Sequence, residues 1–211
     1  LMQVPDWVQR DDLKFECFYP GTPKSLQKNH NFFDAIHAGD ILLHHPYQSF
    51  TPVIELLDQA ANDSQVVAIK MTVYRTGTDS VLMQSLLRAA QNGKEVTVVV
   101  ELMARFDEEA NIGWATKLEE VGAHVVYGVV GYKTHAKMLM IVRREEGKSG
   151  SLLRRYVHLG TGNYHPRTAR LYSDFGLLTC NEEIGIDVNE VFKQLTGLGR
   201  AQALKHLWQA P

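Results

Sequence analysis

The chain has few cysteines and no apolar run long enough to cross a membrane. Its 211 residues include only Cys17 and Cys180, which lie far apart and fit no CxxC pattern. A disulfide scaffold is therefore excluded, and free thiols in a reducing compartment are expected. The apolar run around Val96–Val100 is far shorter than the roughly 20 residues of a spanning helix. With no signal-peptide pattern either, we expect a cytoplasmic protein without a transmembrane segment.

The chain also lacks an excess of charge of one sign. Lys and Arg number 22 against 24 Asp and Glu, which gives a net charge of −2. This balance excludes the basic coat of a protein that binds nucleic acid non-specifically, but it leaves room for a local basic cluster. Its 45% hydrophobic and 22% charged residues are typical of a globular domain. The length allows one complete domain and a short appendage.

The composition changes along the chain and divides it into three parts. Residues 1–28 carry prolines and glycine without periodicity, which predicts a linker or arm from a preceding domain. Residues 29–198 form the predicted domain, and residues 199–211 a terminal helix or tail. Because the chain begins with Leu1 rather than methionine, we expect it to be a piece of a longer protein.

Three consecutive helix-strand units follow an expected first helix at 29–39. The helices are expected at 51–62, 79–93 and 108–121, and the strands at 65–74, 95–101 and 124–127. Further apolar runs at 137–143, 156–160 and 171–179 have no helices between them, and a polar hairpin loop is expected at 144–151. The predicted class is α/β, a mostly parallel central sheet with an antiparallel extension at one side and helices on both faces.

The segment Lys133–Lys137 precedes one of these strands. His135 and Lys137 are two residues apart, so on an extended chain their side chains point to the same face. A neutral imidazole can attack phosphorus, and an ammonium group beside it can offset phosphate charge. The alternative is a chance arrangement at a solvated strand end.

A glycine-rich turn follows this strand and its hairpin. In His158–Asn163, the two glycines form a tight turn whose backbone N–H groups and Asn163 side chain can face an anion. An H-x-K pair followed by such a turn resembles half of a phospholipase D-type active site. The aspartate that this family carries seven residues after the histidine falls at Val142, which counts against a phosphodiesterase.

Two arginines follow the first two strands of the predicted parallel sheet. Arg75 and Arg105 are expected at its carboxyl edge together with His135, where ligands bind in open α/β sheets. Guanidinium groups suit phosphate, so the set predicts a polyanion site that contains a nucleophile. Either arginine alone would more simply form a surface salt bridge with Asp79, Asp107 or Glu108.

Two other polar tracts allow a functional and a structural interpretation. The acidic run Asp107–Glu109 suits a magnesium site, but a helix N-terminus is favoured. The tract Arg167–Asp174 places Arg170 near the ring of Tyr172, which suits phosphate contacts and stacking on a nucleotide. By itself this tract is an ordinary start of a strand.

Together the motifs resemble the polyphosphate kinase family of the long-chain-synthesising type. The segments that carry the resemblance are Ile41–Tyr47, Ala68–Arg75, Val99–Asn111, Lys133–Lys137, His158–Asn163 and Thr168–Asp174. It covers nearly the whole chain from residue 29 to 197. Members have an N-terminal domain, a head domain and two C-terminal domains of phospholipase D-like fold, and this chain is similar to the first of those two.

The resemblance implies a role for several residues. His135 corresponds to the histidine that ATP phosphorylates, with Lys137 beside it, and Tyr172 to a nucleotide contact. Arg75 and Arg105 correspond to positions associated with Mg²⁺ and phosphate; since a guanidinium has no free electron pair, that association runs through shared phosphate oxygens.

The implied activity is the reversible transfer of the terminal phosphate of ATP to inorganic polyphosphate through a phosphohistidine (EC 2.7.4.1). The implied cofactor is Mg²⁺, and the partners are ATP or ADP, polyphosphate, the remaining domains and further copies in a homo-oligomer. No nucleic acid is expected. The resemblance places the protein in the cytoplasm, or peripherally at the inner membrane. Because the second C-terminal domain supplies another histidine, the fragment is expected to be incomplete.

Two alternatives from other classes stay open. One is a phospholipase D-type phosphodiesterase or nuclease assembled from two H-x-K halves, which Val142 and the near-neutral charge disfavour. The other is a non-catalytic fragment that binds polyphosphate or docks to its sister domains.

Overall fold

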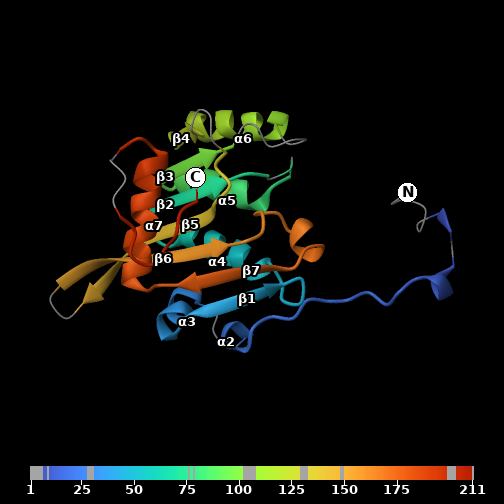
Figure 1. The fold of residues 1–211 in the computed structure, drawn as a ribbon. Coiled ribbons are helices and arrows are strands. Elements are labelled where there is room, and N and C mark those ends of the chain that lie inside the picture. Colours follow the sequence, from blue (N-terminus) through green and yellow to red (C-terminus); the bar gives the residue numbers. More distant parts are fainter. Residues whose placement is uncertain are drawn as a thin grey trace.

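One seven-stranded sheet organises the chain in a computed structural model (Figure 1). The structure describes residues 7–8, 10–27, 31–75, 77, 79–101, 108–128, 133–147, 150–198 and 203–210. The strands are β1 (Ile41–His45), β2 (Val66–Val73), β3 (Glu95–Val100), β4 (His124–Tyr127), β5 (Lys137–Gly147), β6 (Gly150–Gly160) and β7 (Asp174–Thr179). The helices are η1 (Asp11–Leu13), α2 (Lys24–Gln27), α3 (Phe32–Ala38), α4 (Thr51–Asn62), α5 (Val81–Gln91), α6 (Glu108–Glu120), η2 (Thr168–Arg170) and α7 (Glu182–Leu195).

The strand order is β1-β7-β6-β5-β2-β3-β4. The α/β class and the antiparallel extension at one side of the sheet are confirmed. The parallel part is smaller than predicted, because only the β2–β3 and β3–β4 pairings are parallel, whereas the other four are antiparallel. The strand at Ile41–His45 was not among the predicted elements, and it forms by pairing with β7, which lies far along the chain.

The β5–β6 hairpin is longer than predicted. A loop was expected at 144–151, but both strands continue through this polar stretch to pair Gly147 with Gly150. The end of the hairpin projects beyond the body of the domain, at the left of Figure 1, so its polar side chains can be solvated. Opposite charges pair across it, with Arg154 Nε 2.7 Å from Glu145 Oε2. The polar residues that predicted a loop therefore belong mostly to the two paired strands.

Side-chain caps start two of the helices inside their predicted ranges, two to three residues after the predicted starts. Asn31 accepts hydrogen bonds from the N–H groups of Phe33 and Asp34 at the start of α3, and Ser80 accepts one from Met83 at the start of α5. Helix α6 begins at Glu108 with acidic residues in its first turn, as the helix interpretation of the acidic run predicts. Asp107 itself lies outside the described residues.

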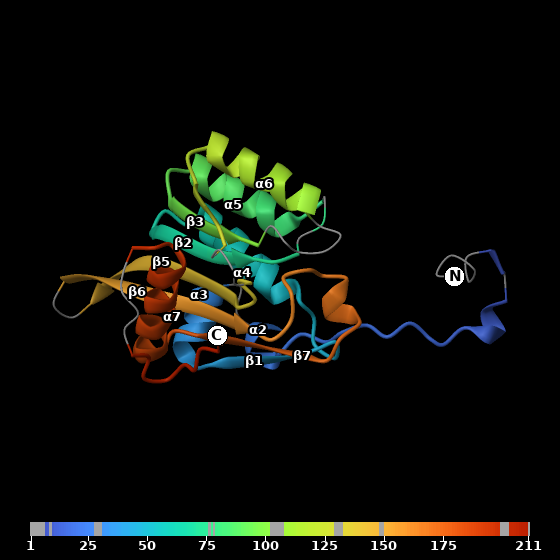
Figure 2. The same ribbon diagram turned by 45° about the horizontal axis from the view of Figure 1, so that its top comes forward.

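The two faces of the sheet bury separate cores. Helices α3, α4, α5 and α6 cover one face, and α7 covers the other (Figure 2). Strand β5 shows the alternation: Leu139 and Ile141 point into the larger core, whereas Met138 and Met140 pack toward Phe192 of α7. Burial on both faces explains why the central strands are almost continuously apolar.

The C-terminal segment differs from the expectation of a helix from Gly199. Residues 203–210 contain no helix, and residues 199–202 lie outside the described part. Instead, the carboxylate of Asp187 in α7 accepts hydrogen bonds from the backbone N–H groups of Lys205, His206 and Leu207. Burial raises the pKa of Asp187, but these N–H groups lower it more, so the net shift is downward. The Asp187 carboxylate thus accepts hydrogen bonds from backbone N–H groups that would donate to backbone carbonyl groups if this segment were a helix.

The N-terminal segment leaves the body of the domain as an extended arm, seen at the right of Figure 1. Gly21 anchors it, since its N–H donates to Tyr47 O and its carbonyl accepts from Ser49 N–H. Beyond this anchor Phe15 is fully exposed. None of the helices in the described ranges is long and apolar enough to cross a membrane.

Candidate active site

The end of β2 and the start of β5 are held together by one buried side chain. Thr72 Oγ1 donates to Ala136 O at 2.6 Å and accepts from Met138 N–H at 3.0 Å. Tyr74 and Arg75 follow β2 directly, and His135 and Lys137 flank the start of β5. The Thr72 hydrogen bonds therefore fix these four residues at the same edge of the sheet.

The ring of Tyr74 is the common contact of three predicted site residues. The His135 ring meets it edge-on, with the two centroids 5.1 Å apart at an interplanar angle of 79°. Lys137 Nζ lies 5.1 Å and Arg75 Cζ 5.6 Å from the Tyr74 centroid, both within cation–π range. The structure thus brings His135, Lys137 and Arg75 together as predicted. Sequence reasoning gave Tyr74 no role, although its place beside Arg75 at a strand end was a usable signal.

The second predicted arginine has no described position. Arg105 belongs to residues 102–107, which lie outside the described residues. Its place in the site stays a prediction. Arg75 contributes a positive charge near Lys137, since it lowers the pKa of that lysine.

The electrostatics of the site favour a neutral imidazole beside a protonated amine. Partial burial, together with the charges of Lys137 and Lys133, lowers the pKa of His135. Lys137 is only 5% exposed, and burial lowers its pKa to about 8; Asp174 raises this pKa and Arg75 lowers it further. Lys137 Nζ also donates to His135 O at 2.5 Å. Near neutral pH, His135 can therefore act as a nucleophile while Lys137 keeps its charge.

His158 is buried next to this cluster. It lies on β6 two residues before Gly160, which pairs with Lys137. Its Nδ1 is 2.9 Å from the Tyr164 hydroxyl, and within the described residues its Nε2 has no hydrogen-bond partner. Burial, and to a lesser degree the nearby His45, lowers the pKa of His158 to about 3, so this ring is neutral. His45 itself is held by Gln48, since its Nδ1 lies 2.8 Å from Gln48 O.

Gly176 on β7 has no side chain, and the His158 ring occupies the space that a side chain at this position would fill. A Cβ at this position would lie 2.6 Å from His158 Nε2. Because the ring is buried, we expect Gly176→Ala to destabilise the fold by about 1–3 kcal/mol, measured by urea denaturation. Gly113→Ala is the matched control, since nothing lies near its Cβ and alanine favours the helix. Equal stability of the two variants would contradict this account of Gly176.

The glycine-rich turn lies beside Lys137 and is closed by an aspartate. Thr161 Oγ1 donates to Asp174 Oδ1 at 2.8 Å, and a Cβ on Gly162 would collide with the Asp174 carboxylate. The buried Asn163 Oδ1 has no hydrogen-bond partner in the described ranges. Sequence reasoning missed Asp174, which ends the tract that starts at Arg167.

The expected nucleotide residues lie at the protein surface. Tyr172 is 62% exposed, and Arg170 is exposed at the end of η2. Within the described residues, no hydrogen bond or ring contact joins either side chain to His135. They are connected to the site through Asp174, which begins β7 and faces Lys137.

Among the described residues, no group of three or more His, Cys, Asp or Glu side chains is arranged to hold a metal ion. Arg75 has no electron pair to offer, so it can meet Mg²⁺ only through phosphate oxygens that both contact.

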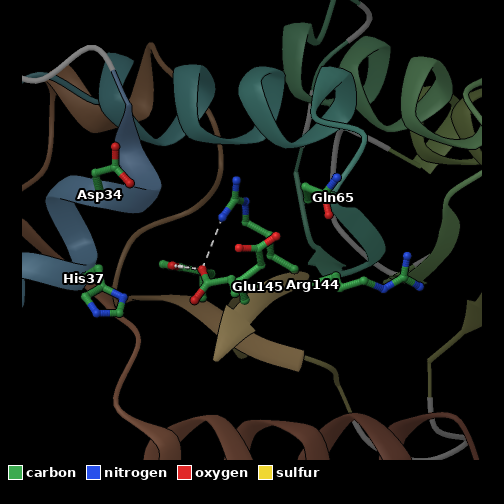
Figure 3. A pocket seen from close by; sticks show the side chains of 8 residues that line it. Asp34, His37, Gln65, Arg144 and Glu145 are labelled. Carbon is green, nitrogen blue, oxygen red and sulfur yellow. Dashed lines mark hydrogen bonds and ion pairs between the residues drawn. The ribbon is translucent and has the colours of Figure 1, made fainter. Parts of the chain in front are cut away.

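Two cavities lie at opposite ends of β5. One, of about 520 Å³, is lined by Asp34, His37 and Glu145, among others (Figure 3), but the Glu145 carboxylate is already paired with Arg143 and Arg154. The other, of about 540 Å³, has the segment from Lys133 to Met138 as one wall. The rest is formed by residues of β6 and α7 and by part of the C-terminal segment: Leu159, Gly160, Val191, Leu195, Leu204 and residues 207–210. Only the second adjoins His135.

Comparisons with known proteins agree over nearly the whole chain. The family model described as polyphosphate kinase C-terminal domain 1 matches residues 31–201. The polyphosphate kinase of Burkholderia cenocepacia (strain HI2424) is 66% identical over all 211 residues, and that of Paraburkholderia phytofirmans (strain PsJN) is 64% identical. The chain spans 31% of the length of each of these relatives.

Solved structures support the same assignment. The polyphosphate kinase of Porphyromonas gingivalis superposes with a TM-score of 0.80 and 34% identity, over 93% of this chain and 32% of that chain. The phospholipase D family member Nuc from Salmonella typhimurium superposes with a TM-score of 0.57 and 15% identity, over 78% of this chain and 97% of that one. The predicted phospholipase D-like fold is thus confirmed.

Proposed function

The chain belongs to the polyphosphate kinase family, and we propose that it carries the histidine which the full-length enzyme phosphorylates during transfer of phosphate from ATP to polyphosphate. The observation that supports this most is the grouping of His135, Lys137 and Arg75 around the Tyr74 ring. The lowered pKa of His135 gives a neutral nucleophile in a cationic setting. This combination suits attack on a phosphate.

The proposed reaction has two phosphoryl transfers. In the first, a ring nitrogen of His135 attacks the γ-phosphorus of ATP, the P–N bond forms and the P–O bond to ADP breaks. In the second, a terminal phosphate oxygen of polyphosphate attacks the same phosphorus, and the P–N bond breaks to regenerate His135. Each cycle breaks one phosphoanhydride and makes another, so the reaction is reversible.

The cations would stabilise charge on the group in transfer. Phosphoryl transfer depends mainly on positioning and electrostatic stabilisation. Lys137 and Arg75 both lie within cation–π range of the Tyr74 ring that His135 contacts, and Arg105 is proposed to join them. The turn that ends in Asn163 lies opposite Lys137 and would bind phosphate through its backbone N–H groups.

Magnesium would enter with the nucleotide as Mg·ATP. When bound, it neutralises phosphate charge, and the arginines would contact oxygens that the ion shares. Tyr172 and Arg170 would hold the nucleotide at the exposed end of the site, by stacking and by phosphate contact.

The remaining parts of the longer enzyme belong to this proposal. The relatives are about three times the length of this chain, so residues 29–198 would act as one catalytic domain beside others, with residues 1–28 as an arm from the preceding domain. We propose that the complete enzyme is a homo-oligomer, in the cytoplasm or peripheral at the inner membrane, and that the fragment alone is weakly active or inactive.

A phosphodiesterase of the phospholipase D type is the second candidate, since Nuc shares the fold. The position of Val142 counts against it. This residue pairs with Ala68 inside the sheet and packs in the core beneath α7, away from the rim at which β5 begins. A diesterase would hydrolyse a generic phosphodiester such as bis(p-nitrophenyl) phosphate, whereas the kinase leaves it intact.

The proposed function is tested by labelling. Full-length enzyme is incubated with Mg²⁺ and ATP labelled on its γ-phosphate, and bound phosphate is assayed for stability in acid and base. We expect a label that is labile in acid and stable in base, and that moves to polyphosphate or to ADP when either is added. Full-length enzyme without such a label would overturn the proposal.

A further inference from the structure

Asn111 of α6 joins the ends of two parallel strands. Its side chain is completely buried, and Nδ2 donates to Tyr74 O and to Glu101 O, each at 3.0 Å. These carbonyl groups stand just beyond β2 and β3, where the ladder of the sheet no longer supplies partners for them. One amide group therefore sets the spacing between the two strand ends.

Glu101 extends this connection to the segment of His135. Its side chain is 4% exposed, and Oε2 accepts from Thr134 N–H at 2.8 Å, one residue before His135. Its own N–H donates to Val73 O at 2.9 Å. The backbone of Glu101 is thus fixed to β2, and its carboxylate holds the segment that leads to His135.

We propose that Asn111 and Glu101 are positioning residues for the phosphoryl transfer, since together they fix His135 relative to Arg75. This inference rests on the proposed function of His135. Neither residue touches the reacting atoms in the described geometry; each acts through the backbone of a residue next to a site residue. Because a buried amide or carboxylate is costly without its hydrogen bonds, these bonds are held firmly and keep the spacing fixed.

The expected consequence is a loss of rate rather than of substrate binding. A shift of about 1 Å in a reacting group can cost about 100-fold in rate. Glu101→Met, which cannot accept from Thr134, and Asn111→Asp, which loses the amide donor, should each slow phosphohistidine formation in the full-length enzyme by about 100-fold. The KM for ATP should change by less than about threefold. Glu101→Gln keeps an oxygen acceptor and should retain most of the rate.

A second readout separates positioning from folding. The modification of His135 by diethyl pyrocarbonate, followed against pH by peptide mass spectrometry, reports the pKa of this ring without any phosphoryl transfer. In the wild-type enzyme this pKa is lowered by burial, Lys137 and Lys133. If Glu101 positions the segment, Glu101→Met should raise the pKa of His135 toward its ordinary value. Glu101→Gln should leave it unchanged.

The matched control is Asn92→Leu. Asn92 also donates from its side-chain amide to a backbone carbonyl, Ala61 O at 2.9 Å, but at the end of α5. The Asn92→Leu variant should have a lower melting temperature than the wild type but the same pKa of His135. The inference is overturned if the Glu101→Met and Asn111→Asp enzymes keep the wild-type pKa and rate, or if Asn92→Leu changes both as much. Absence of phosphohistidine in the wild type, with the pKa shifts present, would instead reject the proposed function.

Discussion

Full-length enzyme with His135→Gln is expected to take up no acid-labile phosphate from ATP and to lose polyphosphate synthesis by about 10⁴-fold or more. Glutamine preserves polarity and approximate size but is no nucleophile toward phosphorus. His135 also contacts the ring of Tyr74, and Lys137 and Arg75 lie against the same ring. The measurement is labelling from γ-labelled ATP together with a polyphosphate synthesis assay.

His124→Gln is the control for this experiment. His124 is exposed at the first residue of β4, at the opposite end of the parallel strands from His135. It should be labelled and active like the wild type. A His135→Gln enzyme that still carries an acid-labile label would place the nucleophile elsewhere and contradict the assignment.

The second large effect concerns Lys137. We expect Lys137→Met to slow phosphohistidine formation by about 10³-fold, because it removes a buried positive charge next to the phosphate in transfer. The pKa of Lys137 is about 8, so raising the pH through this value deprotonates the amine and removes the same charge. The wild-type rate should therefore fall as the pH rises through about 8. Lys137→Arg stays protonated and should show no such fall.

A measurement of protein stability shows whether the lower rate of Lys137→Met comes from the lost charge or from unfolding. Burial lowers the pKa of Lys137 in the folded chain, so the protonated amine opposes folding below a pH of about 8. This cost disappears as the pH rises from about 8 toward the ordinary lysine value of 10.5. At pH 7, Lys137→Met should thus melt no lower than the wild type while its rate is low. A wild-type rate that stays flat across pH 8 would contradict the role given to Lys137.

Much of the local structure was determined by the sequence. The strand at 124–127 has the predicted bounds, and the caps at Asn31 and Ser80 follow from side chains that bond to their own helix starts. The H-x-K spacing and the position of Arg75 after β2 were enough to predict a cationic cluster with a histidine. These features depend on residues within a few positions of one another, or on the rule that parallel strands end at one edge.

The tertiary structure alone decided what holds this cluster in place. Asn111 bonds to Tyr74, 37 residues earlier, and Thr72 bonds to Ala136, 64 residues later. The strand character of Ile41–His45 likewise depends on its distant partner β7. No periodicity in the sequence records such pairings. They arise only when folding buries polar groups that must then find hydrogen-bond partners across the sheet.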